Sequence, residues 1–220
     1  MNSQTFSVII CAAGQSSRLQ GTDKMTFLLD GKTVCDWAID AFLAYPHTKQ
    51  VVVALPADQL KGNPTHPDGR VQYCAGGATR QETVCCAAAC LEPCDLIAVH
   101  DGARPFVRPE LIDEVCRAAA GCGAAFPALP LIDTVHVVKD GAAVQTPDRR
   151  QLVAAQTPQI FTRDAFDAVL CALASGRPVT DECSAAIACG IECWFVPGDR
   201  ENLKITTPED LQTAARIAAK

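Results

Sequence analysis

Short apolar runs rich in β-branched residues alternate along the chain with longer segments in which apolar residues recur every three or four positions. The runs predict buried strands and the longer segments predict helices. This alternation is typical of an α/β protein with a Rossmann-like, mostly parallel sheet and helices on both faces. In chain order we expect strands at 6–12, 50–55, 71–74, 95–100 and 124–129, with helices at 34–44, 80–91 and 109–120.

The alternation breaks after residue 130, where residues 134–138 and 142–146 predict two strands around an Asp140-Gly141 turn. A lone hairpin is only marginally stable in water, so a second subunit is the natural candidate to cover it. We find no internal repeat or linker, and we interpret the chain as one domain with a protruding β-hairpin arm. Beyond the arm we expect helices near 163–174 and 181–189, a strand at 192–196 and a closing helix from 208.

The charge balance argues against a nucleic-acid-binding surface, because the formal net charge is −6 and the isoelectric point is about 5.2. Any anionic ligand must therefore be held by cations placed locally. Hydrophobic residues make up 49% of the 220 residues, enough for a full core, and we expect both Trp37 and Trp194 to belong to it.

The cysteines suggest reduced thiols rather than a disulfide framework. Their number, 13, is odd, and neither a C-x-x-C pair nor zinc-finger spacing occurs. Cys86, Cys90 and Cys94 follow one another at four-residue intervals, which on a helix predicts one shared face of small apolar side chains. We therefore expect a cytoplasmic protein with structural thiols, metal binding being the alternative. No signal peptide or membrane-spanning segment is predicted.

Three predicted loops follow strands at the edge where open parallel sheets bind ligands. Residues 12–24, 75–83 and 100–105 each combine small residues with an arginine. The first loop is neither a Walker A motif nor a dinucleotide fingerprint, yet its small residues would let the backbone approach a nucleotide closely. Arg18 and Lys24 would then meet phosphate oxygens, unless this loop is simply a solvated surface segment.

Each of the other two loops also allows one functional and one structural interpretation. Gly76 and Gly77 could pass under a flat base whose polar edge Thr83 would bond, whereas the structural alternative is a capping box of Thr79 and Glu82 at a helix start. Asp101 ends a strand, where a carboxylate suits Mg²⁺; its alternatives are local backbone bonding or pairing with Arg104. His100 reads as a structural hydrogen-bonder rather than a catalyst.

A series of short motifs covers nearly the whole chain in one order, and with it the sequence resembles the 2-C-methyl-D-erythritol 4-phosphate cytidylyltransferase family of the non-mevalonate isoprenoid pathway. The motifs are Ala12-Ala13-Gly14 with Arg18 and Lys24, Gly76-Gly77-x-x-Arg80-x-x-Thr83-Val84, Val99-His100-Asp101-Gly102-Ala103-Arg104-Pro105, Asp133-Thr134, Asp148-Arg149, Ala155-Gln156-Thr157-Pro158-Gln159-x-Phe161, Thr180-Asp181-Glu182, and Asn202-x-Lys204-Ile205-Thr206-Thr207-Pro208-Glu209-Asp210-Leu211.

The resemblance implies a single nucleotidyltransferase domain over residues 1–220, with the arm at about 131–157 used for homodimerisation. It implies Mg²⁺ and two substrates, CTP and 2-C-methyl-D-erythritol 4-phosphate, whose phosphate attacks the α-phosphorus of CTP and releases pyrophosphate. The residues so assigned are Arg18, Lys24, Lys204 and Arg149 for catalysis; Ala12, Ala13, Gly14, Gly77, Thr83 and Gly102 for CTP; Asp101, Arg104, Thr134, Arg149, Thr157, Thr180 and Lys204 for the acceptor; and Asp101 for the metal. Thr134 and Arg149 would reach the neighbouring subunit's site.

Some positions depart from the family pattern, and two other functions stay open. Cys11, Gly102, Ala78 and His136 stand where the family often has other residues, so a ribose or base contact at Ala78 is in doubt. The Asp23-Lys24 pair is also similar to molybdenum-cofactor guanylyltransferases, against which the later motifs argue. The alternatives are a ribitol-5-phosphate cytidylyltransferase and a nucleotide-binding module without turnover.

Overall fold

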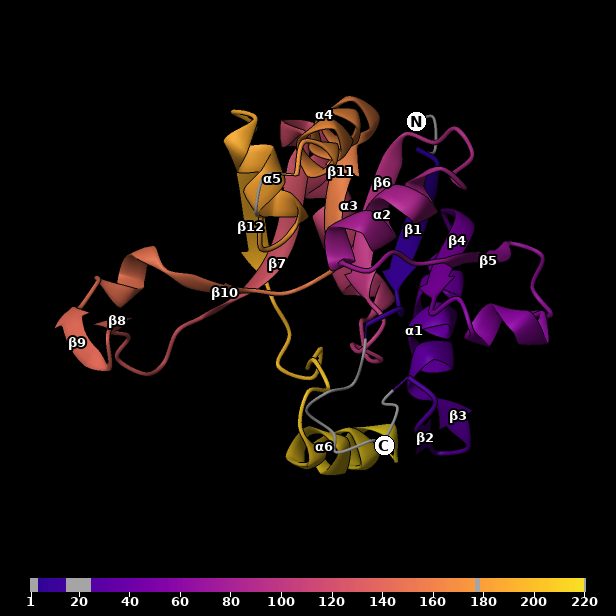
Figure 1. Cartoon of the computed structure of the whole chain (residues 1–220), viewed down its shortest axis with the longest axis horizontal. Helices are drawn as coiled ribbons and strands as arrows, with labels where there is room; N and C mark the ends of the chain where they lie inside the picture. Colours follow the sequence, from indigo (N-terminus) through magenta and orange to yellow (C-terminus); the bar gives the residue numbers. More distant parts are fainter. Residues whose placement is uncertain (1–3, 15–24, 177–178, 220) are drawn as a thin grey trace.

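The computed structural model describes residues 4–14, 25–176 and 179–219, which form one central sheet with helices on both faces (Figure 1). The strand order is β10-β7-β11-β6-β1-β4-β5, with β12 also paired to β7. These strands are β1 (Phe6–Cys11), β4 (Thr48–Leu55), β5 (Val71–Ala75), β6 (Leu96–Asp101), β7 (Ala124–Pro130), β10 (Val153–Ala155), β11 (Gln159–Thr162) and β12 (Cys193–Pro197).

The predicted α/β class is confirmed, and the sheet is mixed rather than purely parallel. β1 pairs in parallel with β4 and β6, β4 with β5, and β7 with β12. β11 enters antiparallel between β6 and β7, and β10 pairs antiparallel with the end of β7. The sequence pattern missed β10 and β11 because each is a run of only three or four residues inside the segment that interrupts the alternation.

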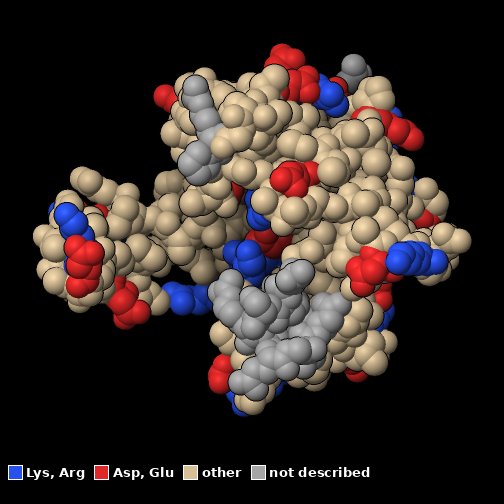
Figure 2. Space-filling view, in the orientation of Figure 1, with Lys and Arg blue, Asp and Glu red and all other residues tan. Residues whose placement is uncertain are grey.

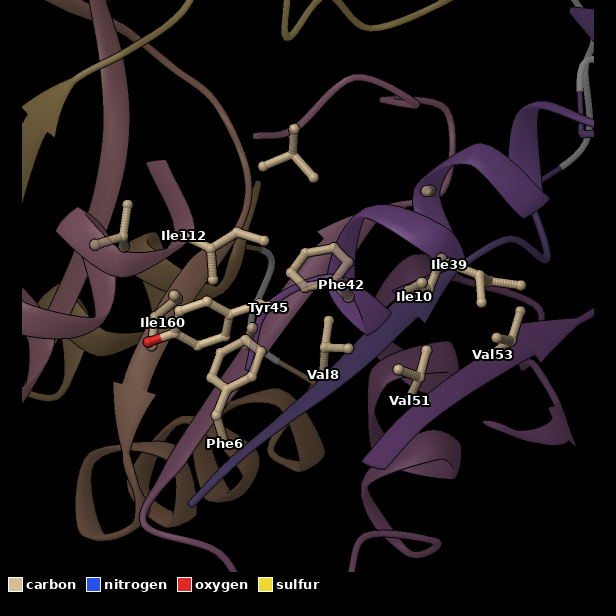
Figure 3. Packing of buried hydrophobic residues seen from close by; sticks show 14 of the residues in the cluster. Phe6, Val8, Ile10, Ile39, Phe42, Tyr45, Val51, Val53, Ile112 and Ile160 are labelled. Carbon is tan, nitrogen blue, oxygen red and sulfur yellow. The ribbon is translucent and has the colours of Figure 1, made fainter. Parts of the chain in front are cut away.

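The core lies on both faces of this sheet because side chains alternate along each strand. Val8 and Ile10 of β1 face one apolar cluster, shown in Figure 3, and Ile9 faces the other. The helices are α1 (Val34–Leu43) and α3 (Pro109–Cys122), which contribute to the first cluster, α2 (Arg80–Ala88), α4 (Arg163–Ala174) and α5 (Glu182–Ala188), which contribute to the second, and α6 (Pro208–Ala218).

Two expectations about the core are wrong. Helix α2 ends at Ala88, so Cys90 and Cys94 lie beyond it and do not share a helical face with Cys86. Trp194 is 60% exposed, although Cys193 and Val196 on the same strand, β12, pack against the two core clusters. All thirteen cysteines are free thiols, as expected. Within the described residues, no helix combines the length and apolar character needed to cross a membrane.

The segment between β7 and β11 forms an arm that projects from the body (Figure 1). It carries the predicted hairpin, β8 (Val137–Lys139) and β9 (Ala142–Gln145), and a 3₁₀ turn at Arg149–Gln151. The turn residues Asp140 and Gly141 have φ of 50° and 82°, the left-handed values that a tight two-residue hairpin turn requires. A second short hairpin joins β2 (Leu28–Leu29) and β3 (Lys32–Thr33).

Candidate active site

The described parts of the three predicted loops meet at the carboxyl edge of the sheet. A Cβ placed on Gly76 would lie 2.3 Å from the Cβ of Ala13, so the first and second loops touch where only glycine fits. The backbone N–H of Gly102 donates to the carbonyl of Cys11 at 3.0 Å, which joins the third loop to the first. Arg18 and Lys24 lie outside the described residues.

The loop before α2 holds its shape through its own hydrogen bonds. The Thr83 hydroxyl accepts from the N–H of Gly77 at 3.1 Å and donates to the carbonyl of Thr79 at 2.8 Å. Thr79 caps the helix as expected, but the reciprocal half of the capping box is wrong, since Glu82 accepts from the N–H of Ala78 instead. In this structure Thr83 therefore fixes the glycine backbone that a base would meet.

Five charged side chains from four parts of the chain meet beside this loop, and we name them the charge cluster: Arg80, Asp101, Arg104, Glu182 and Lys204. Asp101 ends β6 and is central, with Lys204 Nζ 2.9 Å from its Oδ2 and Arg104 Nε 3.6 Å from the same oxygen. Arg80, the first residue of α2, lies 3.4 Å from Oδ1. Figure 2 shows basic and acidic side chains next to one another on the body, in the middle of the view.

The electrostatics of the charge cluster favour an anionic ligand. Three cations face two carboxylates, so the local charge is 3 − 2 = +1 in a chain whose net charge is −6. Burial raises the pKa of Asp101, but Arg80, Lys204 and Arg104 outweigh it and hold that pKa well below its usual range. Asp101 therefore stays ionised, and Lys204, whose side chain is 40% exposed, presents the cluster's positive charge toward solvent.

A buried relay beneath Asp101 fixes its loop. The backbone N–H of Asp101 donates to Thr157 Oγ1 at 3.1 Å, and that hydroxyl lies 3.1 Å from His100 Nδ1. His100 Nε2 lies 3.0 Å from the carbonyl of Arg104, which can only accept, so the partners assign a neutral imidazole with the proton on Nε2. His100 is thus the structural hydrogen-bonder that the sequence predicts, and the Thr157 hydroxyl supports Asp101.

This relay makes stability depend on pH. Burial lowers the pKa of His100 from 6.5 to about 4. The hydrogen bond to the Arg104 carbonyl and the charge of Asp101 oppose this shift, and the charges of Arg104 and Lys204 assist it. The unfolded chain therefore binds a proton that the folded chain refuses, and the free energy of unfolding falls as pH drops from 6.5 toward 4. The lost contribution is about 3 kcal/mol. We expect denaturant titrations to show this slope in the wild type and a flatter one in His100→Asn, whatever its stability at pH 7.

Lys204 is held beside Asp101 by its own segment. The Ile205 N–H donates to the carbonyl of Ala103 at 2.9 Å, and Arg104 Nη1 donates to the carbonyl of Asn202 at 2.8 Å. Asn202 Nδ2 in turn donates to the carbonyl of Thr157 at 2.9 Å. Arg104 is therefore buried, and its Nη1 positions the Lys204 segment, while its Nε has no hydrogen-bond partner among the described residues and lies 3.6 Å from Asp101 Oδ2.

Most of the predicted site residues converge, and the others lie elsewhere. Thr134 and Arg149 are on the arm, where Arg149 donates to the carbonyl of Ile132. Thr180 is just before α5, with its N–H 3.1 Å from Ser184 Oγ, and it stands two residues before Glu182 of the charge cluster. The residues at the sheet edge are Ala12, Ala13, Gly14, Gly77, Thr83, Asp101, Gly102, Arg104, Thr157 and Lys204.

Arg80 and Glu182 belong to the charge cluster, but sequence reasoning gave neither of them a role. Glu182 is 1% exposed, and a buried carboxylate requires a partner cation. Because the two residues lie 102 positions apart, no local pattern could predict their contact. The signal that the sequence offered was that each of them stands in a motif of the family.

The described residues do not fit a magnesium centre built by the protein alone. They hold no group of three or more His, Cys, Asp or Glu side chains placed to bind a metal ion. Asp101 is the one predicted ligand, and its oxygens already face three cations, which repel a divalent ion.

The fold and the site define an α/β protein with cations gathered at the carboxyl edge of its sheet, an arrangement suited to an anionic ligand. A family model described as IspD: 2-C-methyl-D-erythritol 4-phosphate cytidylyltransferase matches residues 6–220. The chain belongs to this family and is a cytidylyltransferase of the isoprenoid precursor pathway.

Relatives and solved structures agree with this assignment. The 2-C-methyl-D-erythritol 4-phosphate cytidylyltransferase of Solibacter usitatus is 36% identical over 94% of this chain and 93% of its own length. The structure of the Thermus thermophilus cytidylyltransferase superposes with a TM-score of 0.82 at 32% identity, covering 98% of this chain and all of the other. The bifunctional enzyme IspD/IspF of Paracoccus denitrificans is 38% identical over 97% of this chain, which spans 56% of that longer protein.

Proposed function

We propose that this chain transfers the cytidylyl group of CTP to 2-C-methyl-D-erythritol 4-phosphate at the charge cluster. The local positive charge around Asp101 carries the proposal, with Lys204 held 2.9 Å from that carboxylate. Residues 76–79, which precede α2 at the same edge of the sheet and include Gly77, are named the nucleotide loop. A phosphate oxygen of the acceptor attacks the α-phosphorus of CTP, a new P–O bond forms, and the bond to the β-phosphate breaks. Pyrophosphate leaves with the electron pair.

The nucleophile is already an anion, so no general base is needed. The barrier then consists of bringing two polyanions together and stabilising the charge that grows at the α-phosphorus. Lys204, with Arg18 and Lys24 assigned from the resemblance, supplies the positive charge. The backbone of Gly77 receives the base, and Thr180 and Asp101 face the acceptor.

A divalent ion, Mg²⁺, is part of the proposal as a companion of the substrate. Its preferred ligands are oxygens, and triphosphate oxygens offer them, whereas the residues around Asp101 do not fit a metal centre of their own. No step of the mechanism above passes through the ion. The free thiols support the expected reducing, cytoplasmic setting.

The arm is proposed to make a homodimer in which each protomer completes its neighbour's site. Ile132, Val138 and Val144 on the arm are 61%, 62% and 58% exposed, an apolar surface that a second copy would cover. Arg149 and Thr134 would then contribute to the acceptor pocket of the partner. Residues 1–220 act as one domain in this proposal, with residues 131–157 as the dimerisation arm.

Pyrophosphate release tests the function directly. The purified chain is given CTP and Mg²⁺ with either 2-C-methyl-D-erythritol 4-phosphate or ribitol 5-phosphate. We expect release with the first acceptor only. Turnover that requires ribitol 5-phosphate would favour the alternative cytidylyltransferase, and CTP binding without release from either acceptor would favour a nucleotide-binding module.

A further inference from the structure

Arg80, whose side chain is 30% exposed, forms an ion pair with the buried Glu182, and the pair joins two loops with different assigned ligands. Both Glu182 carboxylate oxygens lie within hydrogen-bond distance of Arg80 Nη1, at 2.6 and 2.7 Å. Glu182 is the first residue of α5 and Arg80 the first of α2. The pair therefore connects the start of the helix after the nucleotide loop with the start of the helix after Thr180.

The Glu182 end of this ion pair is held in place by hydrogen bonds of the residues next to it in the chain. Gln159 on β11 accepts from the N–H of Cys183 at 2.9 Å and donates to Asp181 at 2.7 Å, so it holds the residues on both sides of Glu182. Ser184 completes the capping box with Asp181 and accepts from the N–H of Thr180 at 3.1 Å. Thr180 and Glu182 therefore belong to one hydrogen-bonded turn at the start of α5.

The other end of the pair reaches the reacting groups through Asp101. Arg80 Nε lies 3.4 Å from Asp101 Oδ1, while Asp101 Oδ2 lies 2.9 Å from Lys204 Nζ. The charges therefore alternate along the series Glu182, Arg80, Asp101 and Lys204, in which each side chain contacts the next. Although burial opposes a charged guanidinium, the carboxylates around Arg80 raise the pKa of that side chain above its usual value.

Stability alone is a weak reason for such a pair. Burying two charges costs about as much as their attraction returns, and well-packed apolar residues replace buried pairs with little or no loss. The pair does fix a geometry that apolar residues would not, because Arg80 Nη1 lies 2.6 Å from Glu182 Oε1 while Nε of the same guanidinium lies 3.4 Å from Asp101 Oδ1.

We propose that Arg80 and Glu182 are positioning residues that couple the nucleotide loop to the acceptor segment, the residues around Thr180 just before α5, so that occupancy of one raises the affinity of the other. Arg80 acts through Asp101, which fixes the position of the Lys204 ammonium group. Glu182 acts through the start of α5, which fixes the position of Thr180. By linkage, an effect of CTP on acceptor binding must equal the effect of the acceptor on CTP binding. This inference rests on the proposed function for the identity of the two ligands.

The test measures coupling in the full chain by binding, without turnover. Calorimetry gives the Kd of 2-C-methyl-D-erythritol 4-phosphate with and without a CTP analogue carrying methylene between the α- and β-phosphorus. In the wild type we expect the analogue to lower that Kd at least ~5-fold. In Arg80→Met with Glu182→Gln, which removes both charges together, we expect the ratio to fall to about 1 while the Kd of the analogue alone changes less than ~3-fold.

A matched control is the surface pair Arg163 and Asp167 on α4, 3.1 Å apart and about half exposed. Arg163→Met with Asp167→Asn should keep the wild-type ratio. If the Arg80 and Glu182 double variant keeps it too, the proposal is wrong. If that variant does not fold, Glu182→Gln alone is measured in the same way and decides by the same ratio. Absence of pyrophosphate release from the wild type would overturn the proposed function, whereas an unchanged binding ratio overturns only the coupling.

Discussion

Replacing Lys204 with methionine is expected to lower kcat for pyrophosphate release by about 10²–10³-fold, the loss seen when one preorganised charge-stabilising donor is removed. Lys204 Nζ lies 2.9 Å from Asp101 and its side chain is 40% exposed, so the ammonium group can turn from the carboxylate toward a phosphate. Methionine keeps the length and packing of the aliphatic stem and removes only the charge.

The fold should survive this change, because Asp101 retains Arg80 and Arg104 as partners. A thermal unfolding curve close to that of the wild type would establish this. Lys49→Met is the matched control: Lys49 pairs with Glu92 at 3.1 Å and donates to the carbonyl of Pro93, away from the charge cluster. A kcat for Lys204→Met within about threefold of the control would remove Lys204 from the reaction.

The elements that could be predicted are those whose sequence pattern decides the structure locally. β1 and β4 are nearly unbroken apolar runs because both of their faces are covered, and α4 lies where its period places it. The Asp140-Gly141 turn is similarly local, since its left-handed φ values restrict the choice of residues.

Other features depend on partners distant in the sequence and could not be predicted. β11 is a strand because β6 and β7 lie on either side of it, and the exposure of Trp194 depends on which face of the sheet the helices leave open to it. The three loops could be placed at one edge from topology, but the ion pair of Arg80 with Glu182 joins residues 102 positions apart. Motifs indicated that these residues matter, and only the structure shows what they contact.

Arg149→Ala is expected to raise the KM for the acceptor far more than the KM for CTP, and mixed dimers should show which subunit uses Arg149. Arg149 lies on the projecting arm, whereas Lys204 lies at the charge cluster on the body (Figure 1). A heterodimer of one Arg149→Ala protomer and one Lys204→Met protomer separates the two possibilities. If the arm completes its neighbour's site, the Arg149→Ala protomer combines its own Lys204 with the intact arm of its partner.

One site of the two is then fully equipped, so the purified heterodimer should recover about half of the wild-type rate, although both parent homodimers are impaired. Differently tagged protomers, co-expressed and purified through both tags, provide this species, and pyrophosphate release at saturating CTP and low acceptor concentration is the measurement. If the arm instead serves its own subunit, neither site holds both residues, and the activity of the heterodimer will not exceed the mean of its parents. That outcome, or equal effects of Arg149→Ala on the KM of both substrates, would place Arg149 outside the acceptor pocket of the neighbouring subunit.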